Sequence, residues 1–139
     1  MVGALDLLDA CIFFGIRNHV GPVRIFQSIA AGLFGRASFT GGAKTAVLGV
    51  LLHFLIASII AAVYYLFSLK IPALINHAVL LGMTYGVAVY FVMNYVVIPL
   101  SATRRPAFTL AVFLNGILGH ALLVGLPVAL ITRRSAKAN

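Results

Sequence analysis

Three long runs without a charged residue dominate this chain. They cover residues 45–69, 71–103 and 106–132, and a Lys or Arg bounds each of them. Each run reaches or exceeds the ~20 residues that an α-helix needs to cross a hydrocarbon core ~30 Å thick. We therefore predict three transmembrane helices, over residues 45–68, 76–100 and 107–132.

The composition supports a membrane location. Hydrophobic residues make up 63% of the 139 residues and charged residues 9%, and the mean hydropathy is +1.12. A soluble domain is about a quarter charged, and a small one leaves much of its surface in water. The net charge of +8 comes from basic residues at the edges of the apolar runs. This pattern favours anchoring to a lipid bilayer and argues against a nucleic-acid partner.

The first forty residues are less regular. Residues 3–19 are apolar but contain both acids of the chain, and we interpret them as a first, tilted transmembrane helix. Residues 24–39 contain two arginines, which argue against a full crossing and favour an interfacial or re-entrant helix. The predicted fold is an all-α membrane bundle over residues 1–139, with four transmembrane helices and one short interfacial or re-entrant helix.

Polar residues recur at similar depths in the predicted spans. If the helices alternate in direction, His53, Asn94 and Asn115 lie roughly 9–13 Å from one membrane face and His120 lies ~20 Å deep. They accompany stripes of small residues, which let helices pack closely. Gly82 and Gly86 have the GxxxG spacing. The predicted packing positions are Gly49, Ala57, Gly82, Gly86, Gly116 and Gly119.

Three interpretations of this polar layer are open. It is a set of interhelical hydrogen bonds, worth roughly 0.6–2 kcal/mol each, or a polar cavity or proton path. A haem held between His53 and His120 is the third. Direct hydrogen bonds among His53, Asn94 and Asn115 would favour the structural interpretation, and a water-filled cavity would favour transport.

The only acids, Asp6 and Asp9, lie three residues apart on one helix face. They belong to a solvated helix start, form an ion pair with Arg17 or Arg24, or carry protons. With residues 24–39 re-entrant, we expect both acids on the membrane face opposite the polar layer.

Several short stretches resemble a group of small bacterial inner-membrane proteins of uncharacterised function. They include residues 27–35, 52–54, 63–65, 93–94 and 99–101. More remotely, the order of Pro22-Val23-Arg24, His53, Pro99-Leu100 and Gly119-His120 is similar to YagU-like inner-membrane proteins. That resemblance implies cytoplasmic termini and a link to acid stress. The basic residues after the last span are also typical of a cytoplasmic anchor.

The sequence contains no recognisable catalytic motif, and the single Cys11 excludes a cysteine-based metal cluster. We therefore predict a non-enzymatic membrane protein, accessory, assembly or stress-related, that acts through helix contacts and needs no cofactor or metal. Its expected partners are the lipid bilayer and another membrane protein or a second copy of itself. The alternatives are a small proton or ion channel or carrier that uses the polar layer, and a haem-binding membrane subunit.

Overall fold

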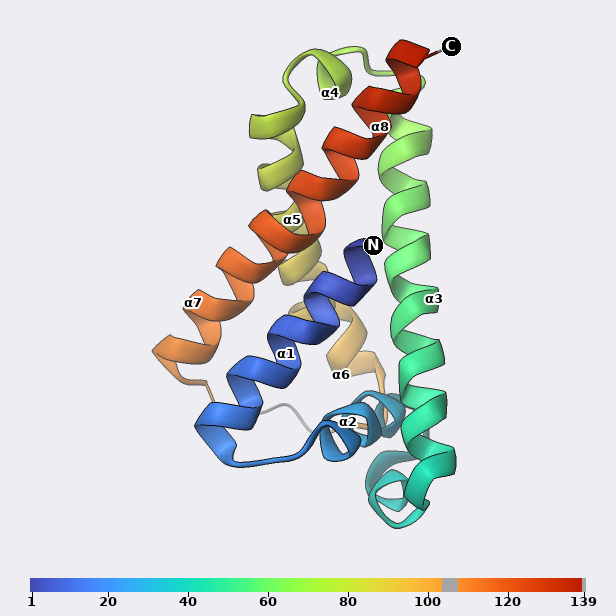
Figure 1. The fold of residues 1–139 in the computed structure, drawn as a ribbon, viewed down its shortest axis with the longest axis vertical. Helices are drawn as coiled ribbons and strands as arrows, with labels where there is room; N and C mark the ends of the chain where they lie inside the picture. Colours follow the sequence, from blue (N-terminus) through green and yellow to red (C-terminus); the bar gives the residue numbers. More distant parts are fainter. Residues whose placement is uncertain (104–107, 139) are drawn as a thin grey trace.

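A computed structural model describes residues 1–103 and 108–138, which form helices joined by turns (Figure 1). Three helical stretches are long and apolar enough to cross a membrane: Gly42–Ser68, Ala78–Leu100 and Leu110–Lys137. The prediction of an all-helical chain with three such spans is confirmed. Residues 104–107, which include the predicted start of the last span at 107, lie outside the described residues.

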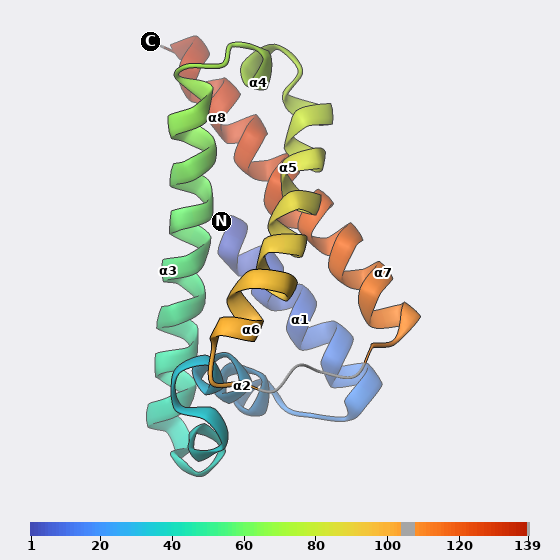
Figure 2. The ribbon, with the colours of Figure 1, turned by 180° about the vertical axis from the view of Figure 1, so that it is seen from behind.

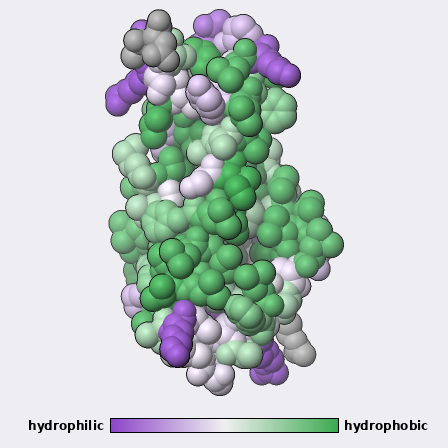
Figure 3. Space-filling model, turned by 90° about the vertical axis from the view of Figure 1, so that its right-hand side faces the viewer, coloured by the Kyte–Doolittle hydropathy of each residue, from purple (hydrophilic) through white to green (hydrophobic). Residues whose placement is uncertain are grey.

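The first of these spans is a single unbroken helix, α3 (Gly42–Ser68), along one side of the molecule (Figure 1). Its first residue has φ +58°, a conformation that glycine adopts at little cost. Figure 3 views the molecule from that side and shows a continuous apolar band between two hydrophilic ends. This distribution matches a hydrocarbon core between two head-group layers.

The other two spans contain π-helical turns. The second consists of α5 (Ala78–Val92), η2 (Met93–Val97) and α6 (Ile98–Leu100), and the third of α7 (Leu110–Gly119), η3 (His120–Gly125) and α8 (Leu126–Ala138). Pro99 and Pro127 each follow a π-helical segment within two residues. A proline ring clashes with the carbonyl four residues earlier, and a wider turn there relieves the clash. In the last span, Pro127 is therefore accommodated by the π-helical segment η3 that precedes it.

The upper end of the molecule in Figure 1 is more helical than predicted. After α3, a short helix, α4 (Ala73–Asn76), precedes α5. The last helix continues to Ala138 instead of ending at residue 132. It therefore carries Arg133, Arg134 and Lys137 as a helical extension of the span.

The predicted interfacial helix does not run through the bundle. It consists of α2 (Pro22–Phe34) and a 3-10 segment, η1 (Gly35–Thr40), and α2 lies across the lower end of the bundle (Figures 1 and 2). Its Gln27 amide is buried and donates a hydrogen bond to the Gly42 carbonyl at 3.0 Å. The Arg24 guanidinium lies 4.1 Å from the centre of the Phe39 ring. The Gln27 bond holds this segment at the start of α3, and the Arg24 contact joins α2 to η1 within the segment.

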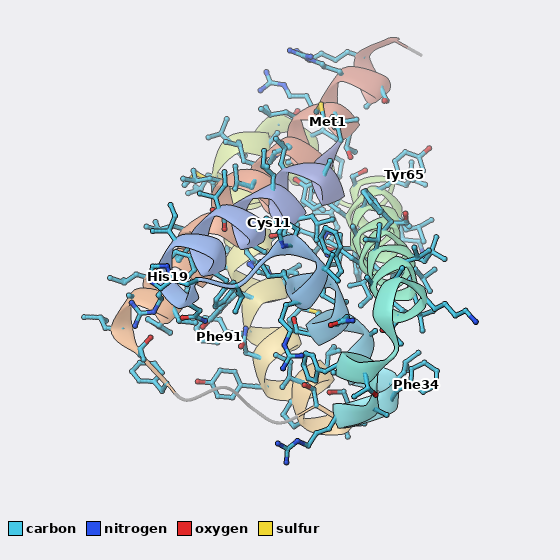
Figure 4. All side chains as sticks on the ribbon, turned by 60° about the horizontal axis from the view of Figure 1, so that its bottom comes forward. Met1, Cys11, His19, Phe34, Tyr65 and Phe91 are labelled. Carbon is cyan, nitrogen blue, oxygen red and sulfur yellow. The ribbon has the colours of Figure 1, made fainter. Side chains whose placement is uncertain are left out.

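Helix α1 (Val2–Asn18) begins beside the middle of α3 and slants toward the lower end of the bundle (Figure 1). A Cβ placed on Gly3 would lie 3.0 Å from the Cβ of Ala57, which is roughly 22 Å along α3 from its start at ~1.5 Å per residue. Figure 4 shows Met1 and His19 at opposite ends of α1. One end of α1 is therefore deep in the bundle and the other is near α2.

A buried apolar cluster joins α1, α3, α5 and α8 above the start of α1. Its buried members are Val2, Tyr64, Ala78, Val124, Val128 and Ala129. Small side chains make up a large part of this cluster, so the helix backbones lie close together there.

Candidate functional site

The second and third spans touch backbone to backbone. A Cβ placed on Gly86 would overlap the carbonyl oxygen of His120, and one on Gly125 would overlap the carbonyl oxygen of Gly82. A Cβ on Gly82 would lie 2.5 Å from the Cβ of Ala129. We call this contact, in which Gly82 and Gly86 of the second span meet His120, Gly125 and Ala129 of the third, the glycine seam.

The other predicted packing positions contact different partners. Gly49 faces the backbone of Phe26 in α2, and Gly116 faces the ring of Tyr90. A Cβ placed on Gly119 would lie 3.2 Å from the Asp9 carboxylate. These three glycines, on two of the spans, therefore serve three separate contacts, and the one at Gly49 joins α3 to the predicted interfacial helix α2.

Polar side chains join α1 to two of the spans. The Nε2 atom of His53 on α3 donates a hydrogen bond to the Gly3 carbonyl at 2.7 Å, and it lies 3.9 Å from Oδ2 of Asp6. On α7, the amide nitrogen of Asn115 donates to Oδ2 of Asp9 at 3.0 Å. The His53 and Asp6 side chains are 13% and 25% exposed. We call Asp6, Asp9, His53 and Asn115 the polar seam.

The predicted placement of the two acids opposite the polar layer is wrong. Asp6 and Asp9 lie against His53 and Asn115, the residues from which they were expected to be separated. The expectation assumed that α1 crosses the whole membrane, which would put its first turns at the far face. Because α1 begins beside the middle of α3, its first turns lie at the depth of the layer.

The other two residues of the predicted layer bond within their own helices. The Asn94 amide donates to the Tyr90 carbonyl at 2.9 Å. The Nδ1 atom of His120 lies 2.9 Å from the Gly116 carbonyl, and its ring packs against that of Tyr90 at 5.6 Å. Both residues lie in π-helical segments, where the period of 3.6 residues used for the prediction does not hold. By contrast, α1 supplies hydrogen-bond partners for His53 and Asn115.

Neither arginine considered as a partner for the acids pairs with one in the described part of the chain. Arg17 donates to the Thr109 hydroxyl at 3.4 Å, and Arg24 stacks on Phe39. Within residues 1–103 and 108–138, the one close contact between an acidic side chain and a basic or imidazole side chain joins Asp6 and His53.

The two histidines proposed for haem face different helices. His53 bonds to α1, whereas His120 bonds within its own helix and contacts Tyr90 of α5. A haem with two axial imidazoles needs both rings on opposite sides of one macrocycle, and this arrangement does not favour that geometry. The described residues also contain no group of three or more His, Cys, Asp or Glu that could hold a metal ion.

Sequence reasoning missed a pair of tyrosines in the upper half of the bundle. Tyr64 donates to the Leu74 carbonyl at 2.9 Å, and Tyr85 donates to the Ile60 carbonyl at 2.7 Å. The centres of their rings lie 5.0 Å apart in an edge-to-face contact. A buried tyrosine hydroxyl needs a hydrogen-bond partner, so Tyr85, in the interior of its helix, was the available signal.

The polar seam can act chemically in two ways. Its direct hydrogen bonds can hold α1 against α3 and α7, or its carboxylates and imidazole can bind and release a proton. No protein-family model matches this chain, and no curated protein or solved structure matches it either. The choice between the two roles therefore depends on the contacts themselves.

Proposed function

We propose that this protein is a non-enzymatic multi-pass protein of the bacterial inner membrane that assists or assembles another membrane protein through helix contacts. The observation that carries the proposal is the direct pairing in the polar seam. His53 bonds to Gly3 at 2.7 Å and Asn115 bonds to Asp9 at 3.0 Å. Polar groups that bond directly across a helix interface hold helices together.

The partner surface in this proposal is the outer face of α3. In the most apolar part of this helix, 11% of the residues are buried inside the protein, against 22% and 33% for the other two spans. α3 is also the one span without a π-helical turn in the described residues. A straight, exposed helix can dock a second helix along its length.

Site-specific photocrosslinking tests the partner surface. A photoreactive residue at Leu55, which is 57% exposed on α3, should give one discrete crosslinked product in native membranes. The matched control is Leu118 on α7, which is 56% exposed and should crosslink to lipid alone. Equal crosslinking at both positions would contradict a partner surface on α3.

The accessory role also predicts how His53→Ala behaves. Removing the imidazole leaves the polar seam short of one partner, which should cost about 1–3 kcal/mol of stability. Proton flux in liposomes should stay at background for both proteins. His19→Asn is the control, because this exposed position has φ +51°, which asparagine tolerates.

We further propose that α1 is a fourth membrane-embedded helix, that residues 24–39 are re-entrant or interfacial, and that the C-terminus is cytoplasmic. The C-terminal ends of α1 and of η1 lie at the same end of the bundle (Figure 1). Cysteines at positions 18 and 41, in a Cys11→Ser background, should therefore react with a membrane-impermeant reagent from the same side. Labelling from opposite sides would show that the segment crosses the membrane.

A second candidate function is proton transfer, and the contact between Asp6 and His53 favours it. The two side chains lie 3.9 Å apart within the bundle, and Asp6 is one of two acidic residues in the chain. Ionisable groups within a membrane are often functional. Asp6→Asn keeps the side-chain size and removes the titrating carboxyl. A proton flux in the native protein that Asp6→Asn and His53→Ala both abolish, with stability unchanged, would replace the accessory role with this one.

A further inference from the structure

An apolar groove of about 310 Å³ lies between α3 and α8, above the first turn of α1. Val2 closes its lower end. Ala61 and Tyr65 line it from α3, and Val128 and Thr132 line it from α8. The groove lies above the first turn of α1, between the upper halves of α3 and α8.

The volume of the groove suits a narrow occupant. A helix is at least ~10 Å wide, so two turns of one would need roughly 800 Å³. Pockets that hold small apolar ligands begin at about 300 Å³. On α3, the small side chains of Ala61 and Ala62 leave this space open below Tyr65.

The upper end of the groove is polar, and basic residues lie close to it in the chain. Ser135 lines its upper end, and the α8 extension carries Arg133, Arg134 and Lys137 within one turn of that point. Lys70 follows α3 at the same end of the molecule (Figure 1). The two acids of the chain lie in α1, in the lower half. An apolar slot below uncompensated cations complements a lipid with an anionic head group.

We propose that this groove binds one acyl chain of an anionic phospholipid, whose phosphate lies among Lys70 and the basic residues of the α8 extension. The lipid takes the place beside α3 and α8 that a full-length first helix would occupy. The groove does not include the polar seam, so this inference is independent of the proposed accessory function.

Lipid retention measured by native mass spectrometry tests the inference. The protein is purified in mild detergent and equilibrated with equal amounts of phosphatidylglycerol and phosphatidylcholine. The native protein should retain one phosphatidylglycerol molecule. Ser135→Phe, at an exposed position in the groove mouth, should reduce that retention about tenfold by filling the slot. Ile59→Phe, at a 54% exposed position elsewhere on α3, is the matched control and should have no effect.

A second pair of variants separates the head-group contact from the apolar slot. Arg134→Gln with Lys137→Gln should lower retention of phosphatidylglycerol by about fivefold per cation removed, without lowering that of phosphatidylcholine. Equal retention of the two lipids by the native protein would overturn the proposal, as would a Ser135→Phe protein that still holds the anionic lipid. A dimer that excludes lipid from the groove would assign the surface to a second copy instead.

Discussion

The glycine seam and the polar seam hold helices together in different ways. In the glycine seam, Gly82 and Gly86 bring the backbone of α5 against the last span, where a Cβ would overlap a carbonyl oxygen. In the polar seam, side chains of Asp9 and Asn115 meet at 3.0 Å from helices that need no such close approach.

Lipid explains why both solutions occur. Apolar side chains gain little by leaving lipid for protein, so helix association in a membrane depends on close packing and hydrogen bonds. The glycine seam joins two full spans, which can pack over many turns. α1 begins beside the middle of α3 and has less length to pack. Polar contacts therefore contribute a larger share of the stability of its association with the spans. Substitutions in the glycine seam should therefore lower the free energy of unfolding more than substitutions in the polar seam.

The largest effect is expected from Gly86→Leu. The new side chain would have to occupy the space of the His120 backbone, which cannot move as a flexible side chain can. We expect a loss of about 3 kcal/mol or more, measured as thermal unfolding in detergent. Ala88→Leu adds the same side chain at an exposed position of α5 and should leave the transition unchanged. Equal transitions for the two variants would show that the glycine seam contributes nothing.

A smaller effect in the same seam is expected from Gly82→Ala. The new Cβ would lie 2.5 Å from that of Ala129, and the loss should be about 1–3 kcal/mol. Ala129→Gly removes the opposing atom, so the double variant should recover much of the lost stability. A double variant less stable than Gly82→Ala alone would mean that the two positions do not meet.

In the polar seam, Asn115→Leu should cost roughly 0.6–2 kcal/mol. The substitution leaves the Asp9 carboxylate without the amide that donates to it. Replacing both residues by leucine should be close to neutral, because no polar group is then left unpaired. Unfolding measurements on the four proteins of this double-mutant cycle give the coupling energy. A coupling energy near zero would show that this hydrogen bond does not stabilise the polar seam.

The smallest effect is expected at the exposed end of α1. Arg17→Gln removes a long, exposed hydrogen bond to Thr109 at 3.4 Å, and such surface changes stay within about 0.5 kcal/mol. The same unfolding assay measures it. A loss as large as that of Asn115→Leu would show that α1 is held at its end, outside the polar seam.

The sequence alone determined the class of protein and its three main helices. Each charge-free run is long enough to cross the hydrocarbon core as a helix. Few folds other than a helical bundle suit such runs, because a backbone in lipid must satisfy its own hydrogen bonds. The two arginines in residues 24–39 also favour an interfacial or re-entrant segment, which stays a prediction. Each of these conclusions depends on local composition and length, which a sequence displays directly.

The tertiary structure decided where the polar residues meet. The rise per residue placed Asn94 at the depth of His53 and His120 deeper, whereas in the structure both lie in π-helical segments and bond to a carbonyl four residues earlier in the same span. The depth of Asp6 depended on where α1 begins beside α3, and no local pattern encodes that position. Contacts between residues such as Asp9 and Asn115, far apart in the chain, follow from how helices of unequal length pack, which is a property of the whole bundle.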